Sequence, residues 1–481
     1  MTDGPIARVA VVGGGLTAWS AAAALKRRIP SIDVTLVPAP VSPDALADRI
    51  ISTTPSIHGF HRDLGLSSAD TIRGAASGLR IGSLFEGWAE GLPSYVHAYG
   101  AYGAPIDGIA FHQLWLRERH AASLPPFDHF SPAAELARSG ASPEEAPDSI
   151  EFGLNLTLER YIALIRDYAL HVGVHAHRGA FSDLTLRSND GFIHKLVCED
   201  GAAITADMFV DCTGPAALLH SRMDRVFVDW SSWLLCDRVA LASGAADPAL
   251  VSMDRVSALP FGWHWAASSP QAASYGLSYS STHASARDID AVFRNSPVET
   301  IGLRQGRRAE FWVRNCVAIG DAAVSVEPLE WTNLHLAHSQ IDRMIDMMPG
   351  RDCAPVELSE FNRQCAAEAD RVRDFLCMHY VCSRRFEPFW KDAAAVSPPD
   401  SLAHTLALFK ERGRLPFYEE ETFSKDSWLA VLLGQGFEPE HINPLTDALS
   451  SAEAMRALTA ASFTLPPAGA TLNSLNPRGI R

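Results

Sequence analysis

A strand, a glycine turn and a helix of small residues open the chain, and no other segment limits its possible folds as strongly. The run reads Arg8-Val-Ala-Val-Val-Gly13-Gly14-Gly15-Leu-Thr-Ala18-Trp19. Gly13 permits a tight turn, Gly15 lets the backbone approach a pyrophosphate group, and the first amides of the helix attract its charge. The pattern predicts a doubly wound dinucleotide-binding unit with Gly13, Gly15, Ala18 and Trp19 at the cofactor. A glycine-rich turn in another α/β unit is the alternative.

Composition and charge exclude several classes of protein. With 481 residues, 47% of them hydrophobic, the chain can bury a large core in one to three domains. Its net charge of -15 argues against nucleic acid as a partner, because neutralising phosphates requires a concentrated basic surface. The eight cysteines include no CxxC pair, so we expect reduced thiols and no metal site. Without a leader or a membrane-length apolar run, a cytoplasmic protein with no membrane partner is predicted.

The end of the second strand lacks a residue that usually completes a dinucleotide site. The strand Asp33-Val-Thr-Leu-Val37 should be followed by a carboxylate that binds the adenosine ribose, and the next residue is Pro38. One hydrogen-bonding anchor for a dinucleotide is therefore missing.

A second strand and glycine turn lie far along the chain. They read Asn315-Cys-Val-Ala-Ile-Gly320-Asp321-Ala-Ala-Val-Ser-Val-Glu327-Pro328-Leu329-Glu330. This run resembles the flavin end of flavin-dependent tryptophan halogenases. The likeness continues over segments 50–55, 78–88, 200–201, 206–214, 262–265 and 373–375. The chain is therefore identified as a divergent member of that family.

The resemblance implies an α/β fold made of three parts. These are a doubly wound, Rossmann-like FAD-binding domain, an inserted mixed β-sheet on the substrate side, and a helical C-terminal region. We expect the FAD-binding domain to span residues 1–357 and the helical region to span 358–481. Within the first part, the flavin-binding segments are 1–60, 150–220 and 305–345, and the substrate-side segments are 61–149 and 221–304.

Family membership also implies a flavoprotein oxidoreductase with two separated sites. A flavin reductase supplies reduced FAD, which reacts with oxygen to give a hydroperoxide that chloride or bromide attacks. The resulting hypohalous acid travels to a small aromatic substrate of the tryptophan or indole type. There a lysine positions it, and a glutamate assists the electrophilic attack. A homodimer is a further expectation.

The residues matched to the glutamate and the halide site follow one another. Pro328-Leu-Glu330 matches the start of the family's Pro-Leu-Glu-Ser-Thr-Gly run, and Trp331, Thr332 and Asn333 replace its last three residues. We expect Glu330 to be catalytic and the backbone amides of Thr332 and Asn333 to bind halide. Losing the glycine limits the backbone angles at Asn333. The alternative for Glu330 is a carboxylate that satisfies the free amides of a helix N-terminus.

Arg80 stands where the family has its lysine, because its spacing to Trp88 equals the family's lysine-to-tryptophan spacing. A guanidinium can donate hydrogen bonds to hypohalous acid, but it stays protonated and is a poor candidate for a haloamine. We therefore count Arg80 among the catalytic residues. An ion pair with a buried carboxylate such as Glu330 is the alternative.

Aromatic residues are expected on the substrate side. Trp263 and Trp265 resemble the family's Trp-x-Trp-x-Ile-Pro signature, with two alanines in place of its final pair. His97 and Tyr99, together with Tyr95, resemble the aromatic sandwich that holds an indole. The alternatives are ordinary core packing for the tryptophans and a structural histidine beside packed tyrosines.

Two further flavin contacts depart from the family pattern. Ile51 replaces the carboxylate of the Gly-Glu-Ala-Thr-x-Pro strap that contacts the flavin. The pair Gly320-Asp321 is more typical of flavoprotein hydroxylases, in which the aspartate contacts the ribityl chain. We expect Gly320 and Asp321 to bind FAD and to replace part of what is lost at Ile51 and Pro38.

Three functions remain open on these grounds. The first is halogenation of an electron-rich aromatic substrate. The second is a flavin monooxygenase that oxygenates its substrate directly, and the third is a catalytically silent binding protein that keeps the halogenase fold.

Overall fold

A largely parallel sheet carries the N-terminal glycine turn. The computed structural model describes residues 4–120, 124–139, 150–250, 252–294 and 296–461. The sheet has the strand order β19-β20-β11-β1-β2-β7, in which β19 alone among the described strands runs antiparallel to its neighbour. Its strands are β1 (Arg8–Val12), β2 (Asp33–Val37), β7 (His175–Ala176), β11 (Met208–Asp211), β19 (Trp312–Val313) and β20 (Cys316–Ala318).

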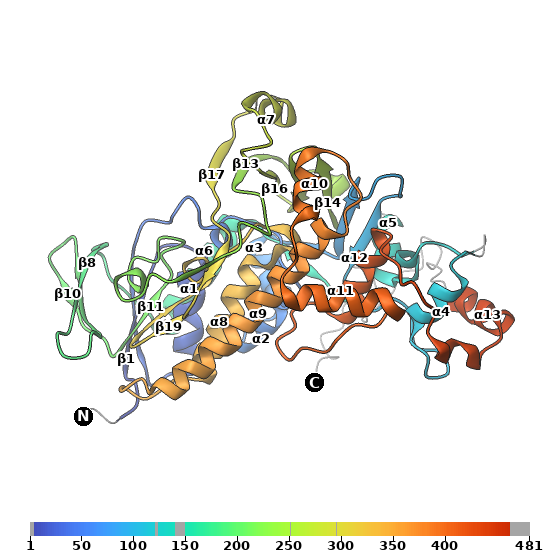
Figure 1. The fold of residues 1–481 in the computed structure, drawn as a ribbon. Helices are drawn as coiled ribbons and strands as arrows, with labels where there is room; N and C mark the ends of the chain where they lie inside the picture. Colours follow the sequence, from blue (N-terminus) through green and yellow to red (C-terminus); the bar gives the residue numbers. More distant parts are fainter. Residues whose placement is uncertain (1–3, 121–123, 140–149, 251, 295, 462–481) are drawn as a thin grey trace.

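Different layers cover the two faces of this sheet. The helices α1 (Leu16–Arg28), α6 (Leu158–His171) and α8 (Thr332–Asp346) pack together on one face (Figure 1). The five alanines of α1 are fully buried, because small side chains allow close packing against the sheet and its neighbouring helices. A small antiparallel sheet of β8 (Phe181–Leu186), β9 (Ile193–Cys198) and β10 (Ala203–Ile204) covers the other face with apolar side chains. The Rossmann-like α/β prediction is confirmed.

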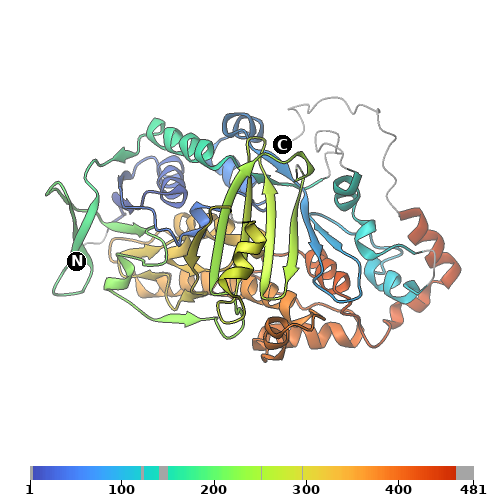
Figure 2. The same cartoon turned by 90° about the horizontal axis from the view of Figure 1, so that it is seen from above.

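A second, mixed sheet forms the substrate side, as predicted. Its order is β17-β13-β16-β15-β14-β4-β5, and the pair β14–β4 is parallel whereas its other pairs are antiparallel. Figure 2 shows these strands side by side, with β4 and β5 in blue at one edge. The strands are β4 (Gly82–Glu86), β5 (Tyr95–Ala98), β13 (Arg238–Ala245), β14 (Met253–Leu259), β15 (Gly262–Ser268), β16 (Ala272–Tyr279) and β17 (Glu299–Gly302).

Helices dominate the chain after the second sheet. The long helix α9 (Pro355–Val381) begins with a proline, lies against α8 and buries most of its second half. It packs against α10 (Pro388–Ala395), α11 (Asp400–Arg412) and α12 (Lys425–Gly434), whereas α13 (Ser451–Ala461) packs on α4 (Phe111–Glu118). Helix α12 packs on β5 and so connects the helical region to the mixed sheet.

Short elements complete the described part of the chain. Two small sheets join β3 (Gly78–Arg80) to β6 (Gly153–Asn155), and β12 (Phe227–Asp229) through β18 (Gly306–Arg308) to β21 (Val324–Ser325). The remaining α-helices are α2 (Ile57–Leu64), α3 (Ser68–Ala75), α4 (Phe111–Glu118), α5 (Pro132–Ser139) and α7 (Ala286–Phe293). Three single turns matter for the site: η1 (Leu46–Asp48), η6 (Gly320–Ala322) and η7 (Leu329–Trp331).

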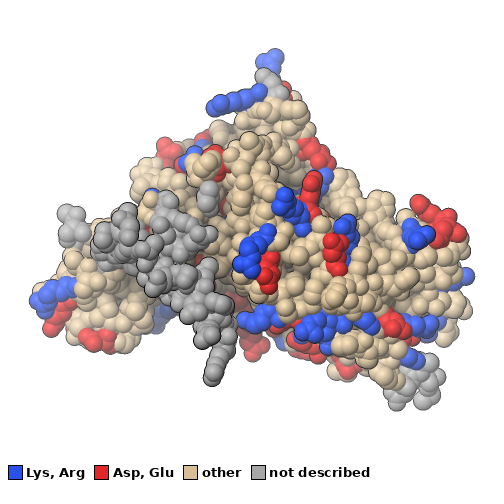
Figure 3. Space-filling model, turned by 180° about the vertical axis from the view of Figure 1, so that it is seen from behind, with Lys and Arg blue, Asp and Glu red and all other residues tan. Residues whose placement is uncertain are grey.

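The surface charges in Figure 3 are mixed in sign and the cysteines are reduced, as the sequence leads us to expect. Basic and acidic side chains alternate over the face shown in Figure 3, where blue groups lie beside red ones. All eight cysteines are buried and unpaired. No helix in the described ranges combines the length and the apolar character that a membrane crossing requires.

Candidate functional site

The glycine turn has the geometry that its sequence predicts. Gly13 has a φ of 156°, and a Cβ there would lie 2.7 Å from the carbonyl oxygen of Cys212 and 2.8 Å from Cβ of Ala18. Only a glycine beside a small residue allows strand and helix to approach this closely. Gly15 is the N-cap of α1, and Trp19 is buried within the same helix.

A carboxylate of the chain itself lies at the first turn of α1. Asp48, at the end of η1, accepts hydrogen bonds through Oδ1 from the amide of Thr17 at 2.8 Å and from its hydroxyl at 3.1 Å. A Cβ on Gly15 would collide with the same carboxylate. Asp48 is buried, and this burial raises its pKa against the opposing hydrogen bonds from Thr17.

Asp321, expected to contact the ribityl chain, holds η1 through one of its two oxygens. Its Oδ2 accepts a hydrogen bond from the amide of Ala47 at 2.8 Å. Gly320 has a φ of 64° and lies so close to Thr17 that a Cβ would be 2.9 Å from its Cγ2. Burial raises the pKa of Asp321 to about 8, and the charge of Asp48 adds to the effect. Asp48 and Asp321 thus both contribute to the position of one buried turn, Asp48 from within it and Asp321 through the amide of Ala47.

The glycine turn does not accept FAD in this conformation. A pyrophosphate would need the amides and the space at the start of α1 that the Asp48 carboxylate occupies. Pro38 and Ile51 remain in place of the two expected polar anchors. The fold therefore keeps the shape of a dinucleotide site, whereas the phosphate position is filled by the protein.

Glu330 lies in η7, away from the glycine turn, and belongs to the second region of expected site residues. Its Oε1 is 2.9 Å from Nδ1 of His97 and 3.2 Å from Nε2 of His379. Burial alone raises the pKa of Glu330, but His97 and His379 outweigh burial and hold the pKa well below its usual range. Burial also lowers the pKa of His379, against the opposing effect of Glu330. The carboxylate thus contacts two histidines and is not a helix cap.

The backbone at this point is left-handed at two successive residues without glycine. Glu330 and Trp331 each have a φ of 62°. Such a conformation costs on the order of 1–3 kcal/mol per residue and persists where the surroundings enforce it. Asn333, where we expected the loss of glycine to matter, lies within helix α8 and has no positive φ.

The expected halide residues begin α8. Trp331 is its N-cap and supplies no side-chain hydrogen bond, which leaves the first amides without a side-chain cap. Thr332 and Asn333 are buried, and Nδ2 of Asn333 donates to the carbonyl oxygen of Val326 at 2.8 Å. The hydroxyl of Thr332 and Oδ1 of Asn333 have no hydrogen-bond partner among the described residues. The start of α8 is therefore buried, and its first backbone amides and the Thr332 hydroxyl are the groups that could donate hydrogen bonds to an anion.

Arg80 forms a buried ion pair, and its partner is Asp254 rather than Glu330. Its Nε donates to Asp254, and Nη2 donates to Oγ of Ser83 at 2.7 Å. Nη1 contacts the hydroxyl of Tyr99 and donates to the carbonyl oxygen of Thr53 at 3.2 Å. Both charged side chains are almost fully buried. The guanidinium is thus held by contacts within the protein.

Trp331 lies between Arg80 and Trp265, one of the two tryptophans of β15. The guanidinium carbon of Arg80 lies 5.6 Å from the centroid of the Trp331 ring. The same ring packs edge-on against Trp265 at 5.9 Å, and its Nε1 donates to Oγ of Ser83 at 3.4 Å. Arg80 and the loop of Glu330 therefore belong to one buried cluster, although they form no direct ion pair with each other in the described contacts.

The tryptophans of β15 are fully packed. Trp263 and Trp265 point to the same face with ring centroids 5.3 Å apart. Nε1 of Trp263 donates to Glu327 at 3.0 Å, and this second buried glutamate also accepts from Ser278 and Tyr380. Burial raises the pKa of Glu327, and the hydrogen bonds from its neutral donors offset only part of this effect.

The three alternate residues around β5 have separate partners. His97 contacts Glu330, and Tyr99 contacts Arg80. Tyr95 stacks on Phe85 at 5.1 Å. The residues of the expected aromatic sandwich are thus brought to the Glu330 region, where each has a protein partner.

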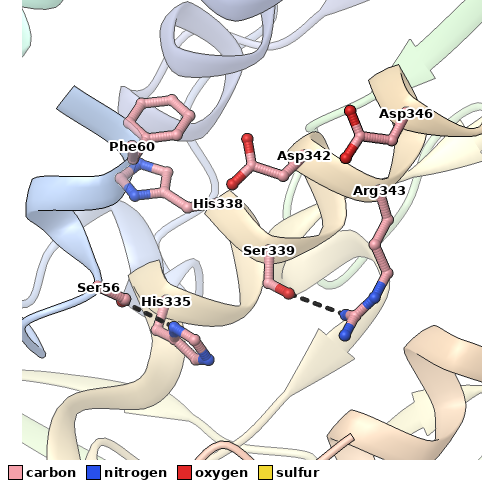
Figure 4. A pocket seen from close by; sticks show the side chains of 8 residues that line it. All are labelled: Ser56, Phe60, His335, His338, Ser339, Asp342, Arg343 and Asp346. Atoms are coloured by element: carbon pink, nitrogen blue, oxygen red, sulfur yellow. Dashed lines mark hydrogen bonds between the residues drawn. The ribbon is translucent and has the colours of Figure 1, made fainter. Parts of the chain in front are cut away.

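Two cavities among the described residues do not include the main residues of the site. One, of about 220 Å³, lies between Ser56, Phe60 of α2 and the exposed side of α8. Figure 4 shows His338 flat against Phe60, and His335 hydrogen-bonded to Ser56. The other, of about 630 Å³, lies between β19 and the start of α9. Neither is lined by Gly13, Arg80 or Glu330, and the first is smaller than ordinary ligand pockets of roughly 300–1,000 Å³.

Sequence reasoning missed Asp48, Asp254, His379 and Glu327. Asp254 gave only a weak signal, since it is an acidic residue beside Arg255 in a strand of mixed polarity, and only its burial shows that it needs a charged partner. His379 lies four residues beyond the segment 373–375 that resembles the family, and it had no assigned role. Asp48 gave no local signal, because an aspartate in a proline-rich loop is ordinary.

A glycine-turn α/β domain joined to a mixed sheet with a buried glutamate among tryptophans defines the class of flavoprotein halogenases. The family model for tryptophan halogenases matches residues 8–451. Tryptophan 7-halogenase KtzQ of Kutzneria sp. (strain 744) is 25% identical, with 93% of this chain and 92% of the relative covered. The chain belongs to the tryptophan halogenase family.

Solved structures agree with this assignment. BrvH, a flavin-dependent halogenase from Brevundimonas sp. BAL3, is 32% identical with a TM-score of 0.89, covering 95% of this chain and 96% of its own. Xcc4156, a flavin-dependent halogenase from Xanthomonas campestris, is 29% identical with a TM-score of 0.90, covering 95% and 94%. FAD and halide are the cofactors of the family to which these proteins belong.

Proposed function

We propose that the chain is a flavin-dependent halogenase that uses reduced FAD, oxygen and chloride or bromide on an electron-rich substrate of the tryptophan or indole type. The observation that carries the proposal is the buried Glu330 carboxylate, held ionised between His97 and His379. An ionised carboxylate in an aromatic, water-poor site can stabilise the cation that forms when an arene is attacked. It can then accept the proton that the arene loses.

The other site residues have roles that follow from their contacts. The uncapped amides of Thr332 and Asn333 bind halide, since a buried helix N-terminus favours an anion. Arg80 acts as a positioning donor through its contact with Tyr99, while Asp254 keeps its charge balanced. Trp263 and Trp265 form the wall that separates the two sites.

The proposal includes a partner and a location. A separate reductase supplies the reduced flavin, as it does for the family whose model matches residues 8–451. A cytoplasmic location agrees with the eight unpaired thiols. We also propose that the protein is a homodimer. Light scattering of the purified protein gives its molar mass in solution and so tests this.

Bromination with purified components tests the proposal. The chain is supplied with a flavin reductase, excess FAD, oxygen and bromide, and a panel of tryptophan, indole and other arenes is analysed by mass spectrometry. We expect a brominated product, with a loss of about 100-fold or more in Glu330→Gln. Glu327→Gln is the matched control, because Glu327 is equally buried but accepts hydrogen bonds from neutral donors.

Two results count against this function. A product that contains oxygen from labelled O2 without halide would indicate a monooxygenase. The absence of any product over the whole panel would indicate a silent halogenase fold.

A further inference from the structure

We propose that Asp48 is an internal anion that competes with FAD for the first turn of α1, so that the cofactor binds only after η1 has moved away. The inference rests on the proposed function, because it concerns how the same enzyme acquires its flavin. It makes Asp48 the residue that sets cofactor affinity in this chain.

The chemistry of the contact supports competition. The amide of Thr17 and its hydroxyl both donate to Oδ1 of Asp48, at 2.8 and 3.1 Å. These are the kinds of donor that a pyrophosphate uses at a helix N-terminus. The positive end of the helix stabilises either anion but has space for one, since the carboxylate lies directly against Gly15.

The turn that carries Asp48 is built into the interior. Ala45, Leu46 and Ala47 are each no more than 1% exposed. The amide of Ala47 donates to Asp321, and the amide of Arg49 donates to the carbonyl oxygen of Leu46 at 3.0 Å. Segment 45–48 therefore has a defined packed position over the glycine turn.

The ends of the segment are held more weakly. Before it, Val41 is 46% exposed. After it, Arg49 pairs with Glu299 at 2.9 Å, and the Glu299 side chain is 52% exposed. Surface pairs of this kind contribute little, so the segment can leave as a unit with its two flanks as hinges.

The consequence is a cofactor affinity below what the fold could provide. When the binding-competent state is only a small fraction of the population, the apparent dissociation constant rises by the inverse of that fraction. Replacing Asp48 removes its charge, and in Asp48→Ala its hydrogen bonds as well, so that the open state gains population. We expect FAD to bind at least about tenfold more tightly to the variant than to the natural chain.

Anaerobic titration with oxidised and reduced FAD tests the inference. The chains compared are the natural protein, Asp48→Ala, Asp48→Asn and the control Asp44→Ala, which removes a carboxylate four residues earlier at a partly exposed position. Both Asp48 variants should bind more tightly, and the control should match the natural chain. Asp48→Asn preserves the side-chain volume and serves if the alanine variant is poorly folded.

Hydrogen exchange provides a readout that does not depend on cofactor binding. The amide of Thr17 should be protected in the natural chain and exchange faster in Asp48→Ala, and FAD should restore its protection. Equal FAD affinity in all four chains would overturn the inference and leave the proposed function standing. A further outcome is that FAD binds none of the four chains although the Thr17 amide exchanges freely in Asp48→Ala. This would overturn the proposed function, and it would also overturn the inference, because an open helix start would then fail to bind FAD.

Discussion

Two buried carboxylates, Asp48 at the glycine turn and Glu330 in the aromatic region, have opposite surroundings. Asp48 takes its hydrogen bonds from an amide and a hydroxyl that cannot change charge, and its pKa is raised. Glu330 contacts two titratable histidines, and its pKa is lowered. The first arrangement closes a binding position, whereas the second provides an ionised group for proton transfer. The family's sequence pattern is therefore present in both regions. In this conformation the Glu330 carboxylate is available for its reaction, whereas the glycine turn is occupied by Asp48.

The largest effect should come from unpairing Arg80 in the aromatic region. Asp254→Asn leaves a guanidinium buried without a matching charge, and we expect a loss of about 3–5 kcal/mol in the free energy of unfolding. Chemical denaturation measures it. The exposed pair of Arg73 and Asp70 gives the control, since Asp70→Asn should leave the free energy of unfolding nearly unchanged. Equal losses in the two variants would show that Arg80 does not depend on Asp254.

A smaller effect should come from crowding the glycine turn. Gly15→Ala places a methyl group against the Asp48 carboxylate, and we expect a cost of about 1–3 kcal/mol. In Asp48→Ala the same substitution should cost much less, because the clashing group is gone. A double-mutant cycle measures this coupling in the free energy of unfolding. Strict additivity of the two substitutions would contradict the packing of η1 over the turn.

A third effect appears only when pH changes, and it concerns Asp321, whose carboxyl group accepts a hydrogen bond from the amide of Ala47 in η1. The pKa of Asp321 is about 8 in the folded chain against an ordinary 3.8, so the native state holds one proton more than the unfolded state between those values. Stability should therefore fall as pH rises from about 4 to about 8. Asp321→Asn removes this contribution, and its Tm relative to the natural chain should rise over that window. Asp44→Asn should show no such trend, and a flat difference for Asp321→Asn would refute the buried neutral carboxyl.

Much of the fold could be predicted from the sequence because its signals are local. The apolar strand, Gly13 and the small residues of α1 lie within one short run, and each restricts the backbone by itself. The mixed sheet and Rossmann-like domain followed from such runs together with the family resemblance. The positions of Glu330, His97 and Trp263 in one region followed in the same way.

The partners of the site residues could not be predicted, because they come from distant parts of the chain. Arg80 and Asp254 are 174 positions apart, and Thr17 and Asp48 are 31 apart. Whether an acidic side chain faces solvent, a histidine or a helix amide depends on how the elements pack. The sequence therefore predicted the strand, glycine turn and helix of the Rossmann-like fold, and it missed the carboxylate that lies against that turn.

The most direct test of the account is the rate of bromination as a function of reduced FAD concentration, measured for the natural chain and for Asp48→Asn. The account predicts product from both, with a half-saturating FAD concentration at least about tenfold lower in the variant and a similar maximal rate. Product from neither chain at any FAD concentration would contradict it.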